Sequence, residues 1–236
     1  MTTALHPVSG PSPARYTPLR VVSFVGAPGS GKSTQIQLLS TALGPNCIVA
    51  SVPKLVRRDP SILTWTTTAE RNEMEQLRLA IEHTRAAGLL APLALDRILL
   101  NCIWRTPPEF TVVLDGCPRG TEPARLYCAT CPRESTVVVH LTFASDEIHY
   151  SLHRQYLRAG QRVGASVPTS DTARFWQKLY VYRDETLAGL DILRSAGFTV
   201  AAMDAAAPRG VVQRLVWDLV GSHQDQAHPD AAGARP

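Results

Sequence analysis

The segment Gly26–Ser33 brings three glycines together with one lysine and two serines, in the order GAPGSGKS. It fits the pattern G-x-x-x-x-G-K-[ST]. It follows an apolar run directly and precedes a stretch of helical periodicity, which is the context that the pattern requires. Glycines let the backbone turn tightly and direct its N–H groups at phosphate oxygens, and the following helix adds the positive end of its dipole. The pattern therefore predicts a loop that binds the phosphates of a nucleotide.

Each position of this loop has an expected task. Lys32 is expected to reach the β- and γ-phosphates of a nucleoside triphosphate, and the Ser33 hydroxyl to ligate Mg²⁺. The backbone N–H groups of the loop are expected to surround the phosphates. The predicted nucleotide-binding residues are Gly26, Gly29, Ser30, Gly31, Lys32, Ser33 and Thr34.

An aspartate that closes an apolar run supplies a second element of this chemistry. Asp115 directly follows the run Thr111–Leu114. A carboxylate beside buried apolar residues is costly unless a cation or hydrogen-bond donors compensate it. Many buried strands end in Asp, so the aspartate gains weight only together with the phosphate loop. Ser33 and Asp115 are the predicted metal ligands.

Short apolar runs alternate with longer stretches of helical periodicity along the chain. The expected strands are Val21–Val25, Cys47–Val52, Thr111–Leu114, Thr136–Leu141 and Phe198–Met203. The expected helices are Lys32–Ala42, Ala69–Ala87, Leu93–Trp104, Thr121–Cys128, Asp146–Ala159, Thr172–Ser195 and Gly210–Val220. Strands that are apolar throughout are covered on both faces, and alternation with helices favours right-handed crossovers. The sequence therefore predicts an α/β fold of the P-loop NTPase-like type, with a doubly wound parallel sheet of about five strands.

The composition is that of one ordinary globular domain. The chain has 236 residues, 44% of them hydrophobic and 19% charged, with a mean hydropathy near zero. It contains no run of 18 or more apolar residues, so no membrane span and no membrane partner are expected. A net charge of +4 suits an anionic ligand but is too small to indicate nucleic acid. Residues 1–19 and 223–236 are expected to be flexible tails around a domain over 20–222.

Five cysteines stand at wide spacings without a secretory signal, which argues against a disulfide framework and for a reducing compartment. Cys128 and Cys131 have the spacing of half a zinc site, but no second pair of ligands stands at a matching distance. Free thiols are therefore the favoured interpretation. The expected location is the cytoplasm. The acid-free start of the chain leaves organelle import as the alternative.

The segment Asp115–Arg119 (DGCPR) resembles the D-G-F-P-R segment of adenylate kinases and UMP/CMP kinases, with Cys117 in place of the usual phenylalanine. Two further segments are similar to stretches of that family. Gly88–Pro92 resembles G-x-L-V-P, and Lys178–Thr186 resembles R-L-x-x-Y-x-x-x-T. The resemblance covers about residues 20–220, with its motifs in the family's order.

The resemblance implies a nucleoside monophosphate kinase that transfers the γ-phosphoryl group of ATP to an acceptor, most often AMP, with Mg²⁺. It implies an acceptor-binding segment over about 51–92 and a short lid over about 159–171. Lys32, Arg119, Arg154 and Arg158 would be catalytic, and Arg154 would also contact the donor. The acceptor-binding residues would be Ser51, Arg57, Gly116, Arg119 and Arg162. The implied partners are nucleotides, and the implied state is a monomer.

Three departures from the family pattern leave alternatives open. Lys178 stands where the family has a second lid arginine, and Pro123 stands where a glutamine reads the acceptor base. The aspartate pair that follows the lid arginine is missing. Proline offers no side-chain donor or acceptor. A UMP/CMP-type acceptor, or a nucleotide-binding regulatory module with weakened catalysis, are therefore the alternatives to an AMP kinase.

Overall fold

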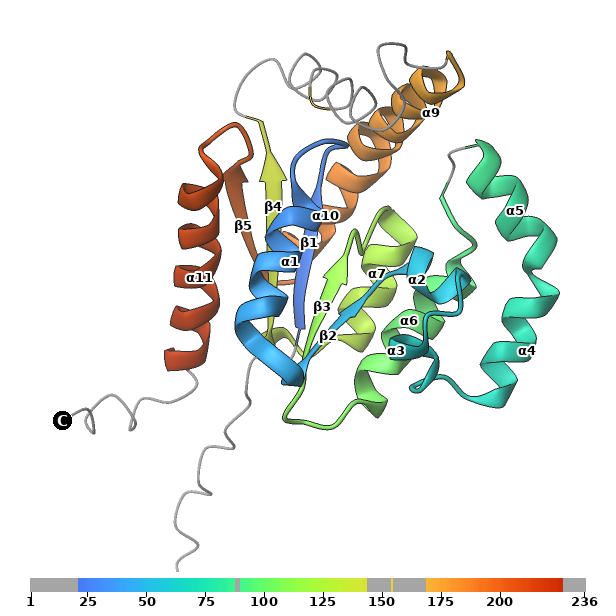
Figure 1. Cartoon of the computed structure of the whole chain (residues 1–236), viewed down its shortest axis with the longest axis horizontal. Coiled ribbons are helices and arrows are strands. Elements are labelled where there is room, and N and C mark those ends of the chain that lie inside the picture. Colours follow the sequence, from blue (N-terminus) through green and yellow to red (C-terminus); the bar gives the residue numbers. More distant parts are fainter. Residues whose placement is uncertain (1–20, 88–89, 144–153, 155–168, 227–236) are drawn as a thin grey trace, which may run out of the picture.

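The computed structural model of the chain describes residues 21–87, 90–143, 154 and 169–226. Within them, five parallel strands form one sheet in the order β2–β3–β1–β4–β5 (Figure 1). The strands are β1 (Val21–Gly26), β2 (Cys47–Ala50), β3 (Thr111–Asp115), β4 (Thr136–Thr142) and β5 (Thr199–Asp204). The predicted parallel sheet of a P-loop NTPase-like fold is confirmed.

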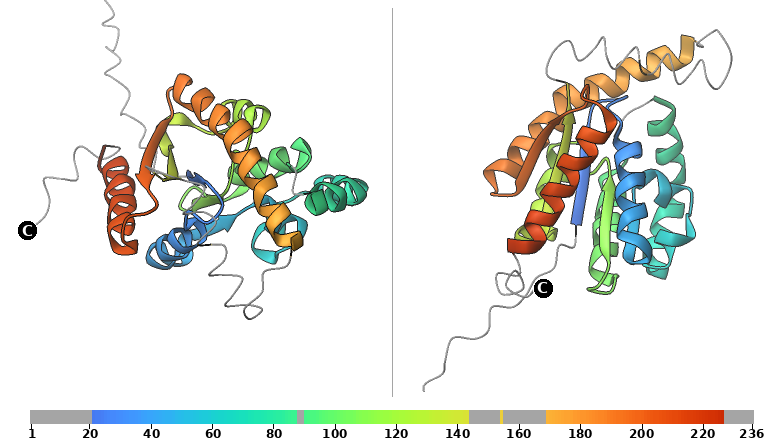
Figure 2. Two further views of the ribbon diagram at one scale, coloured as in Figure 1. Left: turned by 90° about the horizontal axis from the view of Figure 1, so that it is seen from above. Right: turned by 60° about the vertical axis from the view of Figure 1, so that its left-hand side comes forward.

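Successive residues of the central strand β1 pack on opposite faces of the sheet. Val21 and Val25 belong to one apolar cluster, Val22 and Phe24 belong to the other, and all four are buried. A strand covered on both faces has no solvent side, which is why it reads as an unbroken apolar run in the sequence. Figure 2 shows the helices that cover the two faces.

Helices from different parts of the chain form these two layers. One cluster includes α1 (Lys32–Leu43) and α11 (Arg209–Gln226), and the other includes α6 (Leu93–Arg105), α7 (Thr121–Thr130) and α10 (Leu187–Ser195). The buried hydroxyl of Tyr127 in α7 shares a hydrogen bond of 2.7 Å with Ser23 Oγ of β1. This bond satisfies two polar groups that would otherwise be costly to bury.

All five strands point the same way, so their carboxyl ends share one edge of the sheet. Gly26 ends β1 and Asp115 ends β3, and Phe24 of β1 pairs in register with Asp115. The phosphate loop and the predicted metal-binding aspartate therefore begin at neighbouring strand ends. Ligands of doubly wound sheets bind at this edge.

The segment after β2 differs from the expectation. The sequence predicts a strand over Cys47–Val52, but β2 ends at Ala50. Ser51 is instead the N-cap of a short helix, α2 (Val52–Val56), and a second short helix follows, α3 (Pro60–Leu63). Neither helix is long enough to show a hydrophobic period, and each begins with a proline in its first turn. The predicted strand was two residues too long, because Ser51 caps the following helix instead of extending the strand.

The predicted helix Ala69–Ala87 is two helices, α4 (Thr68–Gln76) and α5 (Arg78–Ala87). They are separated at Leu77, which leaves the helical conformation with φ −83° and ψ 0°. One residue outside the helix is too short an interruption to change the spacing of apolar residues. These helices lie beside the β2 edge of the sheet (Figure 1).

The predicted helix Thr172–Ser195 contains a π-helical turn. The structure divides it into α9 (Thr169–Tyr180), the π-helical η3 (Val181–Thr186) and α10. A π-helical turn accommodates an extra residue, and such turns are frequent at functional sites. Here the turn ends at Thr186, the last residue of the segment that resembles R-L-x-x-Y-x-x-x-T.

The remaining elements are the 3₁₀ turns η1 (Gly44–Asn46) and η2 (Arg133–Ser135). Helix α11 continues to Gln226, past the expected end of the domain at residue 222. The predicted helix Asp146–Ala159, apart from residue 154, and the tail 1–19 lie outside the described residues, as does the lid 159–171 except for its last three positions. Among the helices that the structure describes, none is both long and apolar enough to cross a bilayer.

Candidate active site

The phosphate loop leaves β1 where backbone from β4 lies against it. A Cβ on Gly26 would lie 2.2 Å from the carbonyl oxygen of Leu141, so no other residue fits there. Gly29 and Gly31 have φ angles of 82° and 89°, a region that residues with a side chain rarely adopt. Gly31 is also the N-cap of α1, which places the loop at the positive end of that helix. The local sequence therefore folds as its glycine pattern predicts.

Lys32 lies over the loop. Its Nζ donates to the carbonyl oxygens of Gly26 at 2.6 Å and Ala27 at 2.8 Å, and it lies 3.3 Å from Ser30 Oγ. The ammonium is thus held by the backbone of the loop itself. Ser33, in the first turn of α1, is exposed and leaves its hydroxyl accessible to a ligand.

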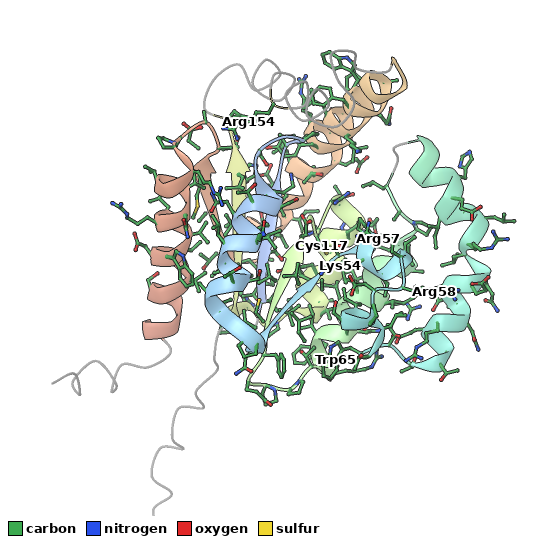
Figure 3. All side chains as sticks on the ribbon, in the orientation of Figure 1. Lys54, Arg57, Arg58, Trp65, Cys117 and Arg154 are labelled. Carbon is green, nitrogen blue, oxygen red and sulfur yellow. The ribbon has the colours of Figure 1, made fainter. Side chains whose placement is uncertain are left out.

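Arg154 is brought to the same loop from a distant part of the sequence (Figure 3). Its Nη1 lies 3.8 Å from the place of a Cβ on Gly31. Its Nη2 donates to the carbonyl oxygen of Ala205 at 2.8 Å, and its guanidinium lies 5.7 Å from the centre of the Phe143 ring. The loop therefore has two cations beside it, one from α1 and one from the chain that follows β4.

The neighbouring strand β3 leads into the segment Asp115–Arg119. Asp115 is half-buried, and the backbone N–H of Gly116 donates to the carbonyl oxygen of Phe24 at 2.8 Å, next to the loop. The Cys117–Pro118 peptide bond is cis. Arg119 is exposed, and its Nε donates to the carbonyl oxygen of Gly116 at 2.7 Å. The guanidinium therefore stays at the carboxyl end of β3.

The π-helical turn holds the backbone of Arg119 in place. Thr186 Oγ1 donates to the carbonyl oxygen of Arg119 at 2.9 Å. Behind it, α10 approaches the start of α7 so closely that a Cβ on Gly189 would lie 2.7 Å from the carbonyl oxygen of Gly120. The position of Arg119 is thus set by contacts with the far end of the chain.

Two expected acceptor-binding residues, Ser51 and Arg57, flank α2, which follows β2, the neighbour of β3 in the sheet. The buried Ser51 Oγ accepts from the backbone N–H of Lys54 at 3.2 Å, so its hydroxyl caps α2. Arg57 is the C-cap of α2 and is exposed. Lys54 Nζ donates to the carbonyl oxygen of Val49 at 3.0 Å. Arg158 and Arg162 lie outside the described residues.

A salt bridge ties the acceptor-binding segment to the core. Glu70 of α4 is almost fully buried and pairs with Arg105 of α6, with Arg105 Nη1 2.7 Å from Glu70 Oε2. Asn101 Nδ2 and the backbone N–H of Thr67 also donate to the carboxylate, at 3.2 Å and 2.9 Å. Burial alone would raise the pKa of Glu70, but these hydrogen bonds outweigh it and lower the pKa to about 2.

Comparison with curated proteins connects these residues to one family. The adenylate kinase of Campylobacter jejuni subsp. jejuni serotype O:23/36 (strain 81-176) is 31% identical over 99 residues, which are 42% of this chain and 46% of that protein. The adenylate kinase of Azobacteroides pseudotrichonymphae genomovar. CFP2 is 24% identical over 176 residues, or 75% of this chain and 84% of that protein.

The chain is a divergent relative of the adenylate kinases. The matched region spans about half the length of the Campylobacter protein, and no family model matches the chain. The adenylate kinase resemblance carried by the loop and the DGCPR segment is thereby confirmed.

One buried acid of this adenylate kinase relative was not anticipated from its sequence. Asp96 lies in the first turn of α6 and is 7% exposed. Cys117 Sγ donates to its Oδ1 at 3.9 Å. Burial raises the pKa of Asp96 to about 6, while the charge of Arg119 and the bond from Cys117 work in the opposite direction. The only signal in the sequence was an acid inside the otherwise apolar pattern of Leu93–Trp104.

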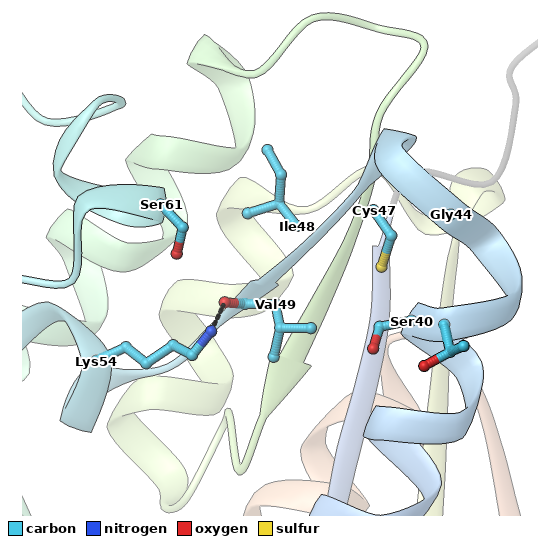
Figure 4. A pocket seen from close by; sticks show the side chains of 8 residues that line it. Ser40, Gly44, Cys47, Ile48, Val49, Lys54 and Ser61 are labelled. Atoms are coloured by element: carbon cyan, nitrogen blue, oxygen red, sulfur yellow. Dashed lines mark hydrogen bonds between the residues drawn. The ribbon is translucent and has the colours of Figure 1, made fainter.

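The cysteines form no metal site in the described residues, and one cavity lies apart from the loop. Within the described residues all five cysteines are free thiols, and no group of three His, Cys, Asp or Glu residues gathers to hold a metal ion. A cavity of about 500 Å³ lies between the last turn of α1 and β2 (Figure 4). It is lined by Ser40, Thr41, Gly44, Cys47, Ile48, Val49, Lys54 and Ser61. The phosphate loop is at the opposite end of α1, so this cavity is not the nucleotide site.

Proposed function

We propose that the chain transfers the γ-phosphoryl group of ATP to a nucleoside monophosphate, with AMP as the main acceptor. The observation that carries this proposal is that two cations, Lys32 and Arg154, lie beside the glycine loop. A transferring phosphoryl group spreads its negative charge over several oxygens, and catalysis consists largely of positioning the group and stabilising that charge. A loop with two cations beside it suits this task.

The donor side fits ATP with Mg²⁺. The left-handed glycines direct the loop backbone around the phosphates, and Lys32 would leave its carbonyl partners for the β- and γ-phosphates. The exposed Ser33 hydroxyl and the half-buried Asp115 carboxylate are oxygen ligands, the type that Mg²⁺ prefers. When bound, the ion would neutralise phosphate charge between them. Ser30 and Thr34 are the remaining residues assigned to binding of the donor phosphates.

The acceptor side is assigned to the carboxyl end of β3. Arg119 and Gly116 would hold the monophosphate, since a planar guanidinium pairs with phosphate oxygens better than an ammonium does. Arg57 would approach from α2, and Ser51 would shape the backbone there. Arg158 and Arg162 belong to the proposed lid. Closure of such a lid would exclude water and limit hydrolysis of ATP.

The proposed partners, oligomeric state and location follow from the same activity. The partners of the enzyme would be ATP and a nucleoside monophosphate, without nucleic acid or membrane, and it would act as a monomer in the cytoplasm. Lys178 and Pro123 favour one rival, a nucleotide-binding regulatory module with weakened transfer. A UMP/CMP-type acceptor is the rival within the same chemistry.

A coupled assay with ATP and each of AMP, CMP, UMP, GMP and dTMP tests the function. We expect turnover with AMP, and a loss of about 10²–10³ in kcat for Arg154→Leu, since that is the usual effect of removing one charge-stabilising donor. Arg194→Ala is the matched control, because this exposed arginine pairs only with the exposed Asp191 among the described residues. Binding of ATP without turnover of any acceptor would reject the kinase in favour of the regulatory module.

A further inference from the structure

Asp96 is a buried carboxylate with little to compensate it. Its one side-chain hydrogen bond within the described part of the chain comes from Cys117 Sγ at 3.9 Å. A thiol is a weak donor, whereas an ionised carboxylate has about four acceptor positions. Buried polar groups are nearly always well paired in folded proteins, so an underused carboxylate calls for an explanation. One explanation is a ligand that completes the pairing.

The carboxylate lies next to the residues assigned to the acceptor. Cys117 immediately follows Gly116 and comes two positions before Arg119. The charge of Arg119 is also close enough to lower the pKa of Asp96 in part. Asp96 belongs to the first turn of α6, at the same edge of the sheet as the carboxyl end of β3. An acceptor with its phosphate on Arg119 therefore has Asp96 within its surroundings.

The start of α7 is apolar where a base-reading side chain would be expected. Pro123 is buried and lies 3.6 Å from the place of a Cβ on Gly120, and Leu90 lies 3.1 Å from the same place. Leu90 comes just before α6, so the first turns of α6 and α7 are neighbours here. Neither Pro123 nor Leu90 can form a side-chain hydrogen bond with a base. Glu185 Oε2 also lies 3.6 Å from the place of a Cβ on Gly120, but Glu185 is exposed, whereas Asp96 is the buried carboxylate beside Cys117.

We propose that Asp96 reads the acceptor base, accepting a hydrogen bond from the amino group at C6 of adenine or C4 of cytosine, and so favouring these two bases over guanine, uracil and thymine. This inference rests on the proposed function. Guanine, uracil and thymine carry a carbonyl oxygen at the position where adenine and cytosine carry this amino group, and a carboxylate repels such an oxygen. A site built on a hydrogen bond to its substrate rejects an analogue without that bond, because its own polar group is then left unpaired.

A purely structural role for Asp96 predicts a different outcome. If the carboxylate only stabilised the first turn of α6 or oriented Arg119, its loss would affect every monophosphate equally, because all of them share the phosphate. Base reading instead changes the ratio between acceptors. The ratio of kcat/KM for AMP to that for UMP therefore separates the two roles.

The experiment measures kcat/KM for AMP, CMP, GMP, UMP and dTMP in the parental chain and in Asp96→Asn. We expect the parental chain to prefer AMP and CMP, and Asp96→Asn to lower kcat/KM for these two by about 10–200-fold, the effect of losing one hydrogen bond to a charged group. UMP should keep its value or gain, because the amide can donate to a base carbonyl. Asp191→Asn, at an exposed aspartate of α10, is the isosteric control and should change none of the ratios.

Two results would overturn the assignment. One is an equal loss for all five acceptors in Asp96→Asn, and the other is a parental chain that prefers GMP, UMP or dTMP. The second result needs no variant, so the test holds even if Asp96→Asn fails to fold. If the parental chain phosphorylates no acceptor, the proposed function fails. Direct titration with AMP and UMP then tests the base preference alone, and equal affinities for the two would reject it.

Discussion

Lys32 shows how far a single side chain can be derived from its neighbours in sequence. The pattern around it predicts a loop, and the structure places its ammonium on the carbonyl oxygens of Gly26 and Ala27. Asp96 is the opposite case. Its burial depends on how α6 meets the end of β3, two segments that pack only in the folded chain, so no local pattern indicated it. Local motifs therefore predict the conformation of the loop, whereas tertiary packing decides the burial of Asp96.

Replacing Lys32 with alanine should nearly abolish phosphoryl transfer while leaving the fold intact. The ammonium would neutralise charge between the β- and γ-phosphates, and one such interaction is typically worth about 10²–10³ in rate. The measurement is kcat in the coupled assay, with far-UV circular dichroism as the check on folding. A folded Lys32→Ala that keeps kcat within about threefold of the parental value, far less than this loss, would exclude the loop as the donor site.

Pro123→Gln should sharpen the preference for AMP over CMP and GMP. A glutamine both donates to and accepts from an adenine edge, whereas packing against proline discriminates by about 10–200-fold only. Pro123 lies in the first turn of α7, where backbone N–H groups lack helical partners, so the change should cost little stability. The readout is the ratio of kcat/KM values. A parental chain that already prefers AMP over CMP and GMP by more than about 10⁴-fold would contradict this reasoning.

The helices and strands with a long apolar pattern were predicted from the sequence. The short helices and helix breaks, which depend on single contacts, were not. The strands were found because burial on both faces makes them apolar throughout. Helices α2 and α3 were missed because a helix of four or five residues has no period to detect. The break at Leu77 and the π-helical turn each displace the helical register by about one residue. Such a displacement leaves the spacing of apolar residues close to that of one continuous helix, so the sequence pattern did not reveal it.

Gly189→Ala tests the close approach of α10 to α7. The added Cβ would lie 2.7 Å from the carbonyl oxygen of Gly120, which is backbone and has little room to move. We expect a loss of about 1–3 kcal/mol in the free energy of unfolding, as for other overpacked sites. Because Thr186 holds the carbonyl oxygen of Arg119, the shift of α10 should also raise KM for the monophosphate. Urea denaturation and the coupled assay measure the two effects.

Gly221→Ala is the matched control for this change. Gly221 lies in α11, and no described atom is within 4 Å of the place of its Cβ. Alanine is the better helix former by up to about 1 kcal/mol, so this variant should be as stable as the parental chain or more so. If both variants lost stability equally, the crowding at Gly120 would not be the cause.

For the molecule as a whole, the salt bridge between Glu70 and Arg105 predicts how stability depends on acid. The pKa of Glu70 is about 2 in the folded state, below the ordinary value of 4.5. A carboxyl with a lowered pKa stabilises the fold fully above its unfolded pKa, and this contribution is lost as the pH falls from 4.5 towards 2. The loss should be on the order of 3 kcal/mol.

Chemical denaturation between pH 3 and 7 measures this dependence. In Glu70→Gln the free energy of unfolding should fall less steeply below pH 4.5 than in the parental chain. Glu122→Gln is the control, because Glu122 is exposed on α7 and its pairing with Arg125 is solvated. Parallel curves for the parental chain and Glu70→Gln would show that the pair contributes nothing to the acid response.

The order of the strands also governs when the phosphate loop can take shape during synthesis. β1 leaves the ribosome first, but its neighbours in the sheet are β3, which begins at Thr111, and β4, which ends at Thr142. The first two strands to be made do not pair with each other, since β2 pairs with β3. A nascent chain that has not yet reached Leu141 therefore lacks the backbone that lies against Gly26. Domains whose pairings join distant segments fold slowly and expose apolar strands meanwhile. Translation through β4 is thus the step at which this nascent chain first acquires a complete loop.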